Sequence, residues 1–282
     1  MKKTIYSRYD KNALNNLPVV DFDGRIIVVL TEAEAEKAVD YLLSADILGM
    51  DTETRPAFKR GQHFQVALLQ VSTRDTCFLF RLNLIGLCPA VVRLLENTTV
   101  PMIGLSWHDD LRMLHHRGDF TPGLFHEIQD MVGDLGIKDL SLQKLYANLF
   151  GKKISKRQRL TNWEAPVLND QQKVYASIDA WACIQLYEEI NRLRDTGDYD
   201  LVVVPEPEPV QKAEPVSDPV PASDTVTVPE PKSGKGSRPA KKPKKPKMTE
   251  KAESKPKDQR KPRKKKNQPK VEKANDIQEN IS

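Results

Sequence analysis

Acidic side chains occur at three places in the chain with spacings that suit a metal site. Asp51 and Glu53 lie two residues apart at the end of an apolar run, and residues two apart in a β-strand point to the same side. Tyr175 and Asp179 lie four apart in a helical pattern, one turn apart on the same face. Asp110 follows a third apolar run, on a predicted turn into a helix. Carboxylate oxygens suit Mg²⁺ or Mn²⁺, so metal-assisted hydrolysis is the chemistry that this set could support.

Each feature also has an ordinary structural explanation when it stands alone. A carboxylate pair at a strand end can be a solvated edge, and a lone Tyr-x-x-x-Asp can be a core tyrosine beside a solvated aspartate. An aspartate in the first turn of a helix is favoured by the helix macrodipole without any catalytic role. Only the complete set, in this order along the chain, supports a stronger inference.

The elements that must position these residues can be predicted from apolar periodicity and turn signals. Two apolar runs flank Thr73-Arg74-Asp75 as a hairpin would, so part of the sheet is expected to be antiparallel. Elsewhere strands and helices alternate, which is typical of an α/β domain. The predicted order is a buried strand at 25–30, a helix at 31–44, strands at 47–53, 66–72 and 76–80, a helix around 91–95, a strand at 102–105, a helix around 111–118, and helices at 141–150 and 169–195.

The composition divides the chain near Val204. Of the 20 prolines, 14 lie in residues 205–282, and no aromatic residue follows Tyr199, so this part lacks the large apolar side chains that could offset the entropy of ordering it. We therefore predict an N-terminal extension (1–24), a catalytic domain (25–204), a Pro/Glu/Val-rich linker (205–230) and a disordered Lys/Pro-rich basic tail (231–282).

The basic character of the protein belongs to its tail. The whole chain has a formal net charge of +5, but residues 1–204 carry 24 Lys and Arg against 27 Asp and Glu. Residues 231–271 alone carry 18 against three. Such a segment binds phosphate backbones through counterion release, so we expect it to tether nucleic acid; a tail that only aids solubility is the alternative. Its Lys-Lys-Pro-Lys-Lys-Pro-Lys run would also suit a nuclear address in a eukaryote.

Three single cysteines bear on the compartment. Cys77, Cys88 and Cys183 lie among apolar neighbours without the paired spacing of a zinc site or a disulfide framework. No signal-peptide core and no run of apolar residues long enough for a membrane span is apparent. We expect a soluble intracellular protein with no membrane partner, cytoplasmic in a bacterium or nuclear in a eukaryote.

The ordered set resembles the three exonuclease motifs of the DEDD superfamily, in the Tyr subclass of ribonuclease D and Werner-type exonuclease domains. The resemblance spans roughly residues 25–195. The segments that carry it are Asp51-Thr-Glu-Thr-Arg-Pro-Ala-Phe58, Val66-Ala-Leu-Leu-Gln70, Ile103-Gly104 ahead of Asp110, Thr161-Asn-Trp163, Leu168, Gln172 and Tyr175-Ala-x-x-Asp179-Ala180.

This resemblance implies a ribonuclease H-like mixed sheet flanked by helices, with the carboxylates meeting at one end of the sheet. It implies a two-metal 3′–5′ exonuclease acting on DNA or RNA, with Mg²⁺ or Mn²⁺ as cofactor, because none of the five histidines lies in these motifs in ligand spacing. Counting from the Ile103-Gly104 strand favours Asp110 over its neighbour Asp109 as the second-motif ligand, although helical spacing does not separate the two. The non-catalytic alternative is an adaptor that keeps the fold and binds nucleic acid.

The implied roles follow the metal ligands. Glu53 and Asp179 would hold the ion that activates water, Asp51 would bridge two ions, and Asp110 would help to hold the second. Tyr175 would orient or deprotonate the attacking water. Four further residues, Phe58, Gln65, Gln70 and His108, are candidate contacts to the terminal nucleotide. A basic loop, which is either solvated or in contact with phosphate, contains Lys152, Lys153, Lys156, Arg157 and Arg159.

Overall fold

A six-stranded mixed sheet forms the centre of the computed structural model, which describes residues 2–205. The predicted basic tail, and the linker apart from Pro205, lie outside the described residues. The spatial order is β2-β5-β4-β3-β6-β7; β4 is antiparallel to β3 and β5, and the other pairs are parallel. The strands are β2 (Arg25–Val29), β3 (Leu48–Thr54), β4 (Val66–Ser72), β5 (Thr76–Phe80), β6 (Met102–Gly104) and β7 (Phe125–Glu127).

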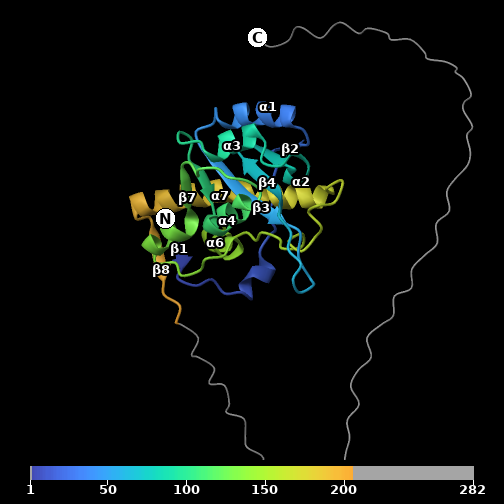
Figure 1. The fold of residues 1–282 in the computed structure, drawn as a ribbon. Helices are drawn as coiled ribbons and strands as arrows, with labels where there is room; N and C mark the ends of the chain where they lie inside the picture. Colours follow the sequence, from blue (N-terminus) through green and yellow to red (C-terminus); the bar gives the residue numbers. More distant parts are fainter. Residues whose placement is uncertain (1, 206–282) are drawn as a thin grey trace, which may run out of the picture. The chain divides into compact units, whose positions relative to one another are not determined.

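Helices cover both faces of this sheet, as the alternation of β5 shows. Phe78 and Phe80 pack into a core cluster with α1 (Glu32–Leu42) and α3 (Pro89–Leu95), whereas Cys77 and Leu79 pack into a second cluster with α6 (Leu142–Phe150) and α7 (Asp170–Thr196). Figure 1 shows α1 and α3 on one side of the sheet and α6 on the other. The fold class predicted from the sequence, a mixed sheet flanked by helices, is therefore confirmed. The remaining elements are η1 (Ala13–Asn16), α2 (Leu82–Ile85), α4 (Trp107–His115), α5 (Ile128–Met131) and η2 (Val132–Leu135).

The 27-residue helix α7 is the longest element and packs against β3, β4, β5 and β6. Its start is defined by a capping box, in which Asn169 accepts from the backbone of Gln172 and the Gln172 side chain accepts from the backbone of Asn169. A second capping box, between Thr31 and Glu34, begins α1 at the predicted position. The first residue of each helix is therefore determined by hydrogen bonds from nearby side chains in its capping box.

Three features differ from the sequence predictions. The strand at 25–29 lies at the sheet edge with alternating exposure, so its prediction as a buried strand was wrong. The strand β7 was not predicted. Helix α4 begins at Trp107, four residues before the predicted start, which places Asp110 inside its first turn.

The N-terminal residues are part of this structure. Strand β1 (Lys3–Tyr6) pairs in parallel with β8 (Tyr199–Val202), so Ile5 lies opposite Leu201 and is fully buried. Val20 and Phe22 join the core cluster beneath α7. Residues 1–24, set apart in the sequence as an extension, thus supply core side chains and a strand. None of the helices within residues 2–205 combines the length and apolarity that a membrane span requires.

Candidate active site

Two carboxylates of the candidate site lie on β3. Asp51 and Glu53 are two residues apart on this strand, which pairs with β4 on one side and β6 on the other. A bulge follows Glu53 and ends the regular pairing with β4. Opposite Asp51 in the register is Gln70, whose Nε2 donates to Asp51 Oδ2 at 3.3 Å.

A close approach of α7 to β3 brings the third carboxylate to the site. A Cβ on Gly49 would lie 2.0 Å from the carbonyl oxygen of Ala180, so only glycine allows the helix to pack so near the strand. Asp179, the residue before Ala180, is thereby set beside the strand pair. Carboxylate oxygens of Asp51, Glu53 and Asp179 lie within 4.8 Å of one another, close enough to hold a metal ion.

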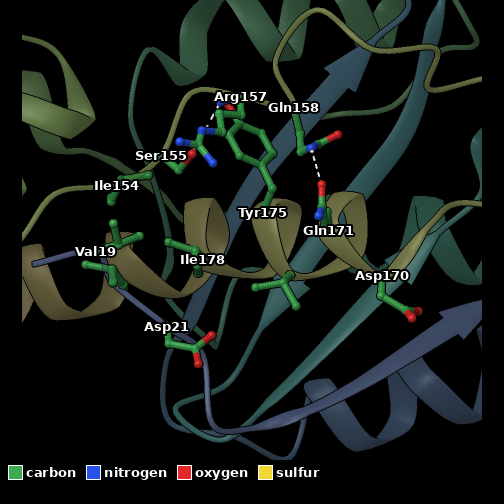
Figure 2. A pocket seen from close by; sticks show the side chains of 12 residues that line it. Val19, Asp21, Ile154, Ser155, Arg157, Gln158, Asp170, Gln171, Tyr175 and Ile178 are labelled. Carbon is green, nitrogen blue, oxygen red and sulfur yellow. Dashed lines mark hydrogen bonds between the residues drawn. The ribbon is translucent and has the colours of Figure 1, made fainter.

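Tyr175 lies one turn before Asp179 on α7 and is mostly buried. Its ring stands 6.0 Å from the fully buried Trp163 ring, centroid to centroid. Figure 2 shows Tyr175 extending from α7 toward Arg157 and Gln158, across a cavity of about 540 Å³ that it lines. The tyrosine also lines a second cavity, of about 280 Å³, together with Asp179. It therefore forms a wall between the acidic cluster and the loop before Trp163.

Helix α4 supplies the fourth carboxylate. Asp110 accepts a hydrogen bond from Thr52 Oγ1, the residue between Asp51 and Glu53, while the Asp109 side chain is 78% exposed and pairs with Arg112 at 3.0 Å. The structure therefore separates the two neighbouring aspartates and turns Asp110 toward β3. Asp110 is not one of the three residues whose ligand oxygens meet within 4.8 Å, so it stands at the margin of the cluster.

The position of α4 depends on a distant cap. The Glu127 carboxylate, at the end of β7, accepts from the backbone N–H groups of Ser106 and Trp107 at the start of the helix. Ser106 itself is in the left-handed region, with φ 62°, and its side chain provides no cap. This tertiary cap explains why α4 begins earlier than the local sequence predicts.

The electrostatics of the cluster are those of a buried anionic site. Burial and the neighbouring carboxylates Asp179 and Asp110 raise the pKa of Glu53 to about 9. Burial raises the pKa values of Asp110 and Asp179 to about 7, against opposing hydrogen bonds from Thr52 and Tyr175.

The pKa values of two more groups of the site, Asp51 and Tyr175, are also raised. The pKa of Asp51 is raised well above its ordinary value by burial and by the other three carboxylates. Burial and the charge of Asp179 raise the pKa of the Tyr175 phenol. Groups that repel one another in this way are stabilised as anions by bound cations, and an all-oxygen donor set is the kind that Mg²⁺ or Mn²⁺ takes.

The structure distributes the four predicted nucleotide contacts unevenly. Phe58 is 79% exposed on the loop after β3, and His108 is exposed on α4. Gln65 is exposed and donates to the carbonyl of His116 at 2.9 Å. Gln70 is fully buried and its amide donates to Asp51, so it lies behind the carboxylates, and its contact with a nucleotide stays a prediction.

Sequence reasoning missed three residues that shape the site. Gly49 precedes the first motif by two residues, and its need appears only when α7 is packed on β3. Glu127 acts from another strand and left no local signal. Thr52 lies between two predicted ligands, and its hydroxyl could have been singled out as a possible partner for a neighbouring carboxylate.

Known proteins are similar to this chain in sequence and in fold. A family model described as 3′-5′ exonuclease matches residues 26–194. The chain is 28% identical over 193 residues to the bifunctional 3′-5′ exonuclease/ATP-dependent helicase WRN of Mus musculus, a match that covers 65% of this chain and 14% of that protein. A 3′-5′ exonuclease of Arabidopsis thaliana is 28% identical over 210 residues, covering 68% of this chain and 73% of the relative.

Solved structures are similar in fold. The EXO domain of Aedes aegypti Nibbler superposes with a TM-score of 0.57 at 18% identity, covering 64% of this chain and 94% of that one. Ribonuclease D of Escherichia coli superposes with a TM-score of 0.53 at 16% identity, covering 64% and 52%. The fold is that of ribonuclease H-like DEDD exonucleases, and the acidic cluster could hold a metal ion. The chain belongs to the 3′-5′ exonuclease family, whose model covers most of the described residues.

Proposed function

We propose that this protein removes nucleotides from the 3′ end of DNA or RNA by hydrolysing the terminal phosphodiester bond with divalent cations. The observation that carries the proposal is the meeting of Asp51, Glu53 and Asp179 oxygens within 4.8 Å, with Tyr175 one helical turn before Asp179 and lining the same cavity. Family membership supports the reaction class. A solved neighbour in complex with RNA, the ribonuclease D of Trypanosoma brucei, supports a nucleic-acid substrate.

The residues divide the work of the reaction. Asp51, Glu53 and Asp179 would hold one cation, and Asp51 with Asp110 a second. Two such ions, when bound, supply activation of water, shielding of the phosphate charge and stabilisation of the departing 3′-oxygen. Water attacks phosphorus, the bond to the 3′-oxygen of the preceding nucleotide breaks, and that oxygen takes up a proton as the nucleoside monophosphate leaves.

Tyr175 acts on the attacking water through position. Its raised pKa makes the phenol a poor base at neutral pH, so we assign it the role of orienting the water by hydrogen bonding. Tyr175 and Asp179 line the same cavity, which places the hydroxyl beside the acidic cluster. Gln70 assists from behind by holding Asp51.

Digestion of labelled oligonucleotides tests the proposal. Matched DNA and RNA strands, with free or blocked 3′ ends, are incubated with Mg²⁺ or Mn²⁺ and the products are resolved by length. We expect stepwise shortening of free ends only, and loss of at least about 1,000-fold in rate for Asp51→Asn, which removes one ligand charge.

The neighbouring aspartates provide the matched control. Asp109→Asn changes the same chemical group on the exposed side of α4 and is expected to keep the wild-type rate. Internal cleavage, or equal rates for Asp51→Asn and the wild type, would refute the proposal. Binding of nucleic acid without any cleavage would indicate the adaptor function instead.

A further inference from the structure

Three cations near the acidic cluster have no ionic partner among the described residues. Arg55 pairs with Glu164 at 3.2 Å, and most other arginines within residues 2–205 likewise contact a carboxylate or a hydrogen-bond acceptor; examples are Arg74, Arg93, Arg112, Arg192 and Arg194. Within the same described range, Lys11, Lys156 and Arg159 form no ion pair and no side-chain hydrogen bond. These exposed cations are available to an external anion.

Two of these cations stand directly at the candidate site. Lys156 and Arg159 line the cavity of about 280 Å³ that Tyr175 and Asp179 also line. Burial lowers the pKa of the Lys156 ammonium, and Arg159 and Lys11 lower it further, whereas Asp179 raises it. Positive groups are therefore gathered here against their mutual repulsion.

A strap of residues 7–20 brings the third cation to the same place. At one end of the strap, the Ser7 carbonyl accepts a hydrogen bond from the backbone N–H of Lys138 at 2.8 Å. At the other end, the strap pairs with Lys153: the Lys153 N–H donates to the Pro18 carbonyl at 2.9 Å, and the Lys153 carbonyl accepts from the Val20 N–H at 3.0 Å. It therefore crosses from the loop before α6 to the loop after it. In Figure 2 the strap residue Val19 lies beside Ile154, which lines both cavities.

Lys11 lies between these two anchors. On one side of it the Tyr9 N–H donates to Asp139 Oδ2 at 2.5 Å, next to the cavity residue Leu140, and on the other the Asn15 carbonyl accepts from Lys153 Nζ at 2.8 Å, next to the cavity residue Ile154. The family model begins at residue 26, so Lys11 lies outside the matched region, whereas Lys156 and Arg159 lie inside it. The presence of Lys156 and Arg159 at the cavity could be explained by their charges alone, which offset the negative charge of the buried carboxylates. This explanation does not account for Lys11, because the charges that perturb those carboxylates are their own neighbours and the cations Lys156 and Arg159.

We propose that Arg159, Lys156 and Lys11 form a continuous cation track that binds the phosphates of the substrate strand on the 5′ side of the scissile bond. The track rests on the proposed function for the identity of its ligand and adds to it the path of the strand. The strand leaves the acidic cluster past Arg159 and Lys156 and crosses the strap at Lys11. Single-stranded nucleic acid is the occupant, because a row of exposed cations leading away from the cluster suits a flexible line of phosphates.

Binding measured without cleavage tests this path. Fluorescence anisotropy of a labelled single strand of about twelve nucleotides, within the usual site size of single-strand binders, is recorded in the Asp51→Asn background. We expect Lys11→Ala to weaken binding about threefold at low salt and to reduce the salt slope by about 0.7, the contribution of one phosphate contact on a single strand. Lys11→Arg should restore both values.

An equivalent lysine elsewhere serves as control. Lys37 on α1 is exposed and unpaired within the described residues, so Lys37→Ala removes the same charge from a different surface and should leave affinity and slope unchanged. If Lys11→Ala unfolds thermally at the same midpoint temperature as the wild-type protein, a folding defect in this variant is excluded. The track is overturned if Lys11→Ala binds with wild-type affinity and slope, or if Lys37→Ala weakens binding equally.

Substrate length separates this proposal from the previous one. In protein with intact carboxylates, Lys11→Ala should raise KM for the long strand much more than KM for a dinucleotide, which ends before the strap. Equal increases for both would place Lys11 at the terminal nucleotide and overturn the 5′ path. If the intact protein binds strands through Lys11 but never cleaves them, the track stands and the exonuclease proposal fails.

Discussion

The carboxylates at the site are placed at a cost to the metal-free fold. Four acidic groups share a partly buried volume, and burial is the largest cause of the raised pKa in each of them. In water the same groups would ionise near pH 4. The folded protein therefore holds protons that the unfolded chain releases, and bound cations would replace those protons.

The stability of the metal-free protein should fall as pH rises. Below about pH 4 both states are protonated and the cluster carries no penalty. Above it the unfolded chain loses protons first, because the folded pKa values are about 7 for Asp110 and Asp179 and about 9 for Glu53. Between pH 5 and pH 9, chelator-treated protein should lose on the order of several kcal/mol of unfolding free energy. Denaturant titrations at stepped pH values measure this loss.

Divalent cations should reverse that trend. Excess Mg²⁺ or Mn²⁺ binds the deprotonated carboxylates and stabilises the folded state more at pH 8 than at pH 6. In Asp179→Asn both the pH slope and the metal effect should shrink. A metal-free protein that becomes more stable from pH 5 to pH 9 would contradict the coupling described here.

At the level of single residues, local spacing was informative and distant contacts were not. Asp51, Glu53, Tyr175 and Asp179 come from two motifs whose strand and helix periods place each pair on one side. Gln70 was expected at the nucleotide, but register with Asp51 places its amide behind the cluster. The burial of Gln70 depends on which strands pair in the sheet, and the spacing of residues along the sequence does not determine that pairing.

Among the elements, the contact of β3 with α7 decides the geometry of the cluster. Gly49→Ala would place a methyl group 2.0 Å from the carbonyl oxygen of Ala180. Because the methyl position is fixed by the backbone of β3 and the carbonyl belongs to the backbone of α7, relieving the clash would require α7 or β3 to move. We expect a loss of about 3 kcal/mol in unfolding free energy, together with weaker metal binding as Asp179 moves away. Chemical denaturation and calorimetric titration with Mn²⁺ measure the two effects.

Gly133→Ala is the matched control for that substitution. A Cβ there meets nothing within 4 Å, and its φ is not positive. Its effect on unfolding should stay within about 0.5 kcal/mol. If the two alanine variants unfold alike and bind metal alike, the close packing of α7 does not position the site.

Elements with their own end signals were predictable, and elements that depend on partners were not. The β4–β5 hairpin was expected from the turn residues between its strands, and α7 was expected from its helical periodicity. The strands β1, β7 and β8 have three or four residues each and are held by pairing with distant chain. Helix α4 starts early because Glu127 caps it from β7.

On the scale of the whole molecule, charge is separated along the chain. Residues 1–204 have a small net negative charge, and the basic residues concentrate in 231–271, outside the described residues. Deleting residues 206–282 should weaken binding of a long oligonucleotide at least about tenfold at low salt, with no change in turnover at saturating substrate, because the lost contacts are electrostatic and all candidate catalytic residues are retained. Anisotropy and steady-state kinetics over a salt series test this.

A shorter deletion distinguishes charge from length. Removing residues 206–230 leaves the basic block of 18 Lys and Arg in place and should preserve most of the affinity. Equal affinity of the full chain and the 206–282 deletion would show that the block does not hold substrate.

The pairing of β1 with β8 has a consequence for synthesis. Lys3 finds its partner only when Tyr199 exists, so during translation the first strand must wait for nearly the entire domain to emerge. At ordinary elongation rates that delay is roughly 10 to 40 s. Throughout it, Ile5 remains on an unpaired segment of a nascent chain. Strand β1 is thus translated well before its partner β8, and cellular chaperones have that interval in which to bind it.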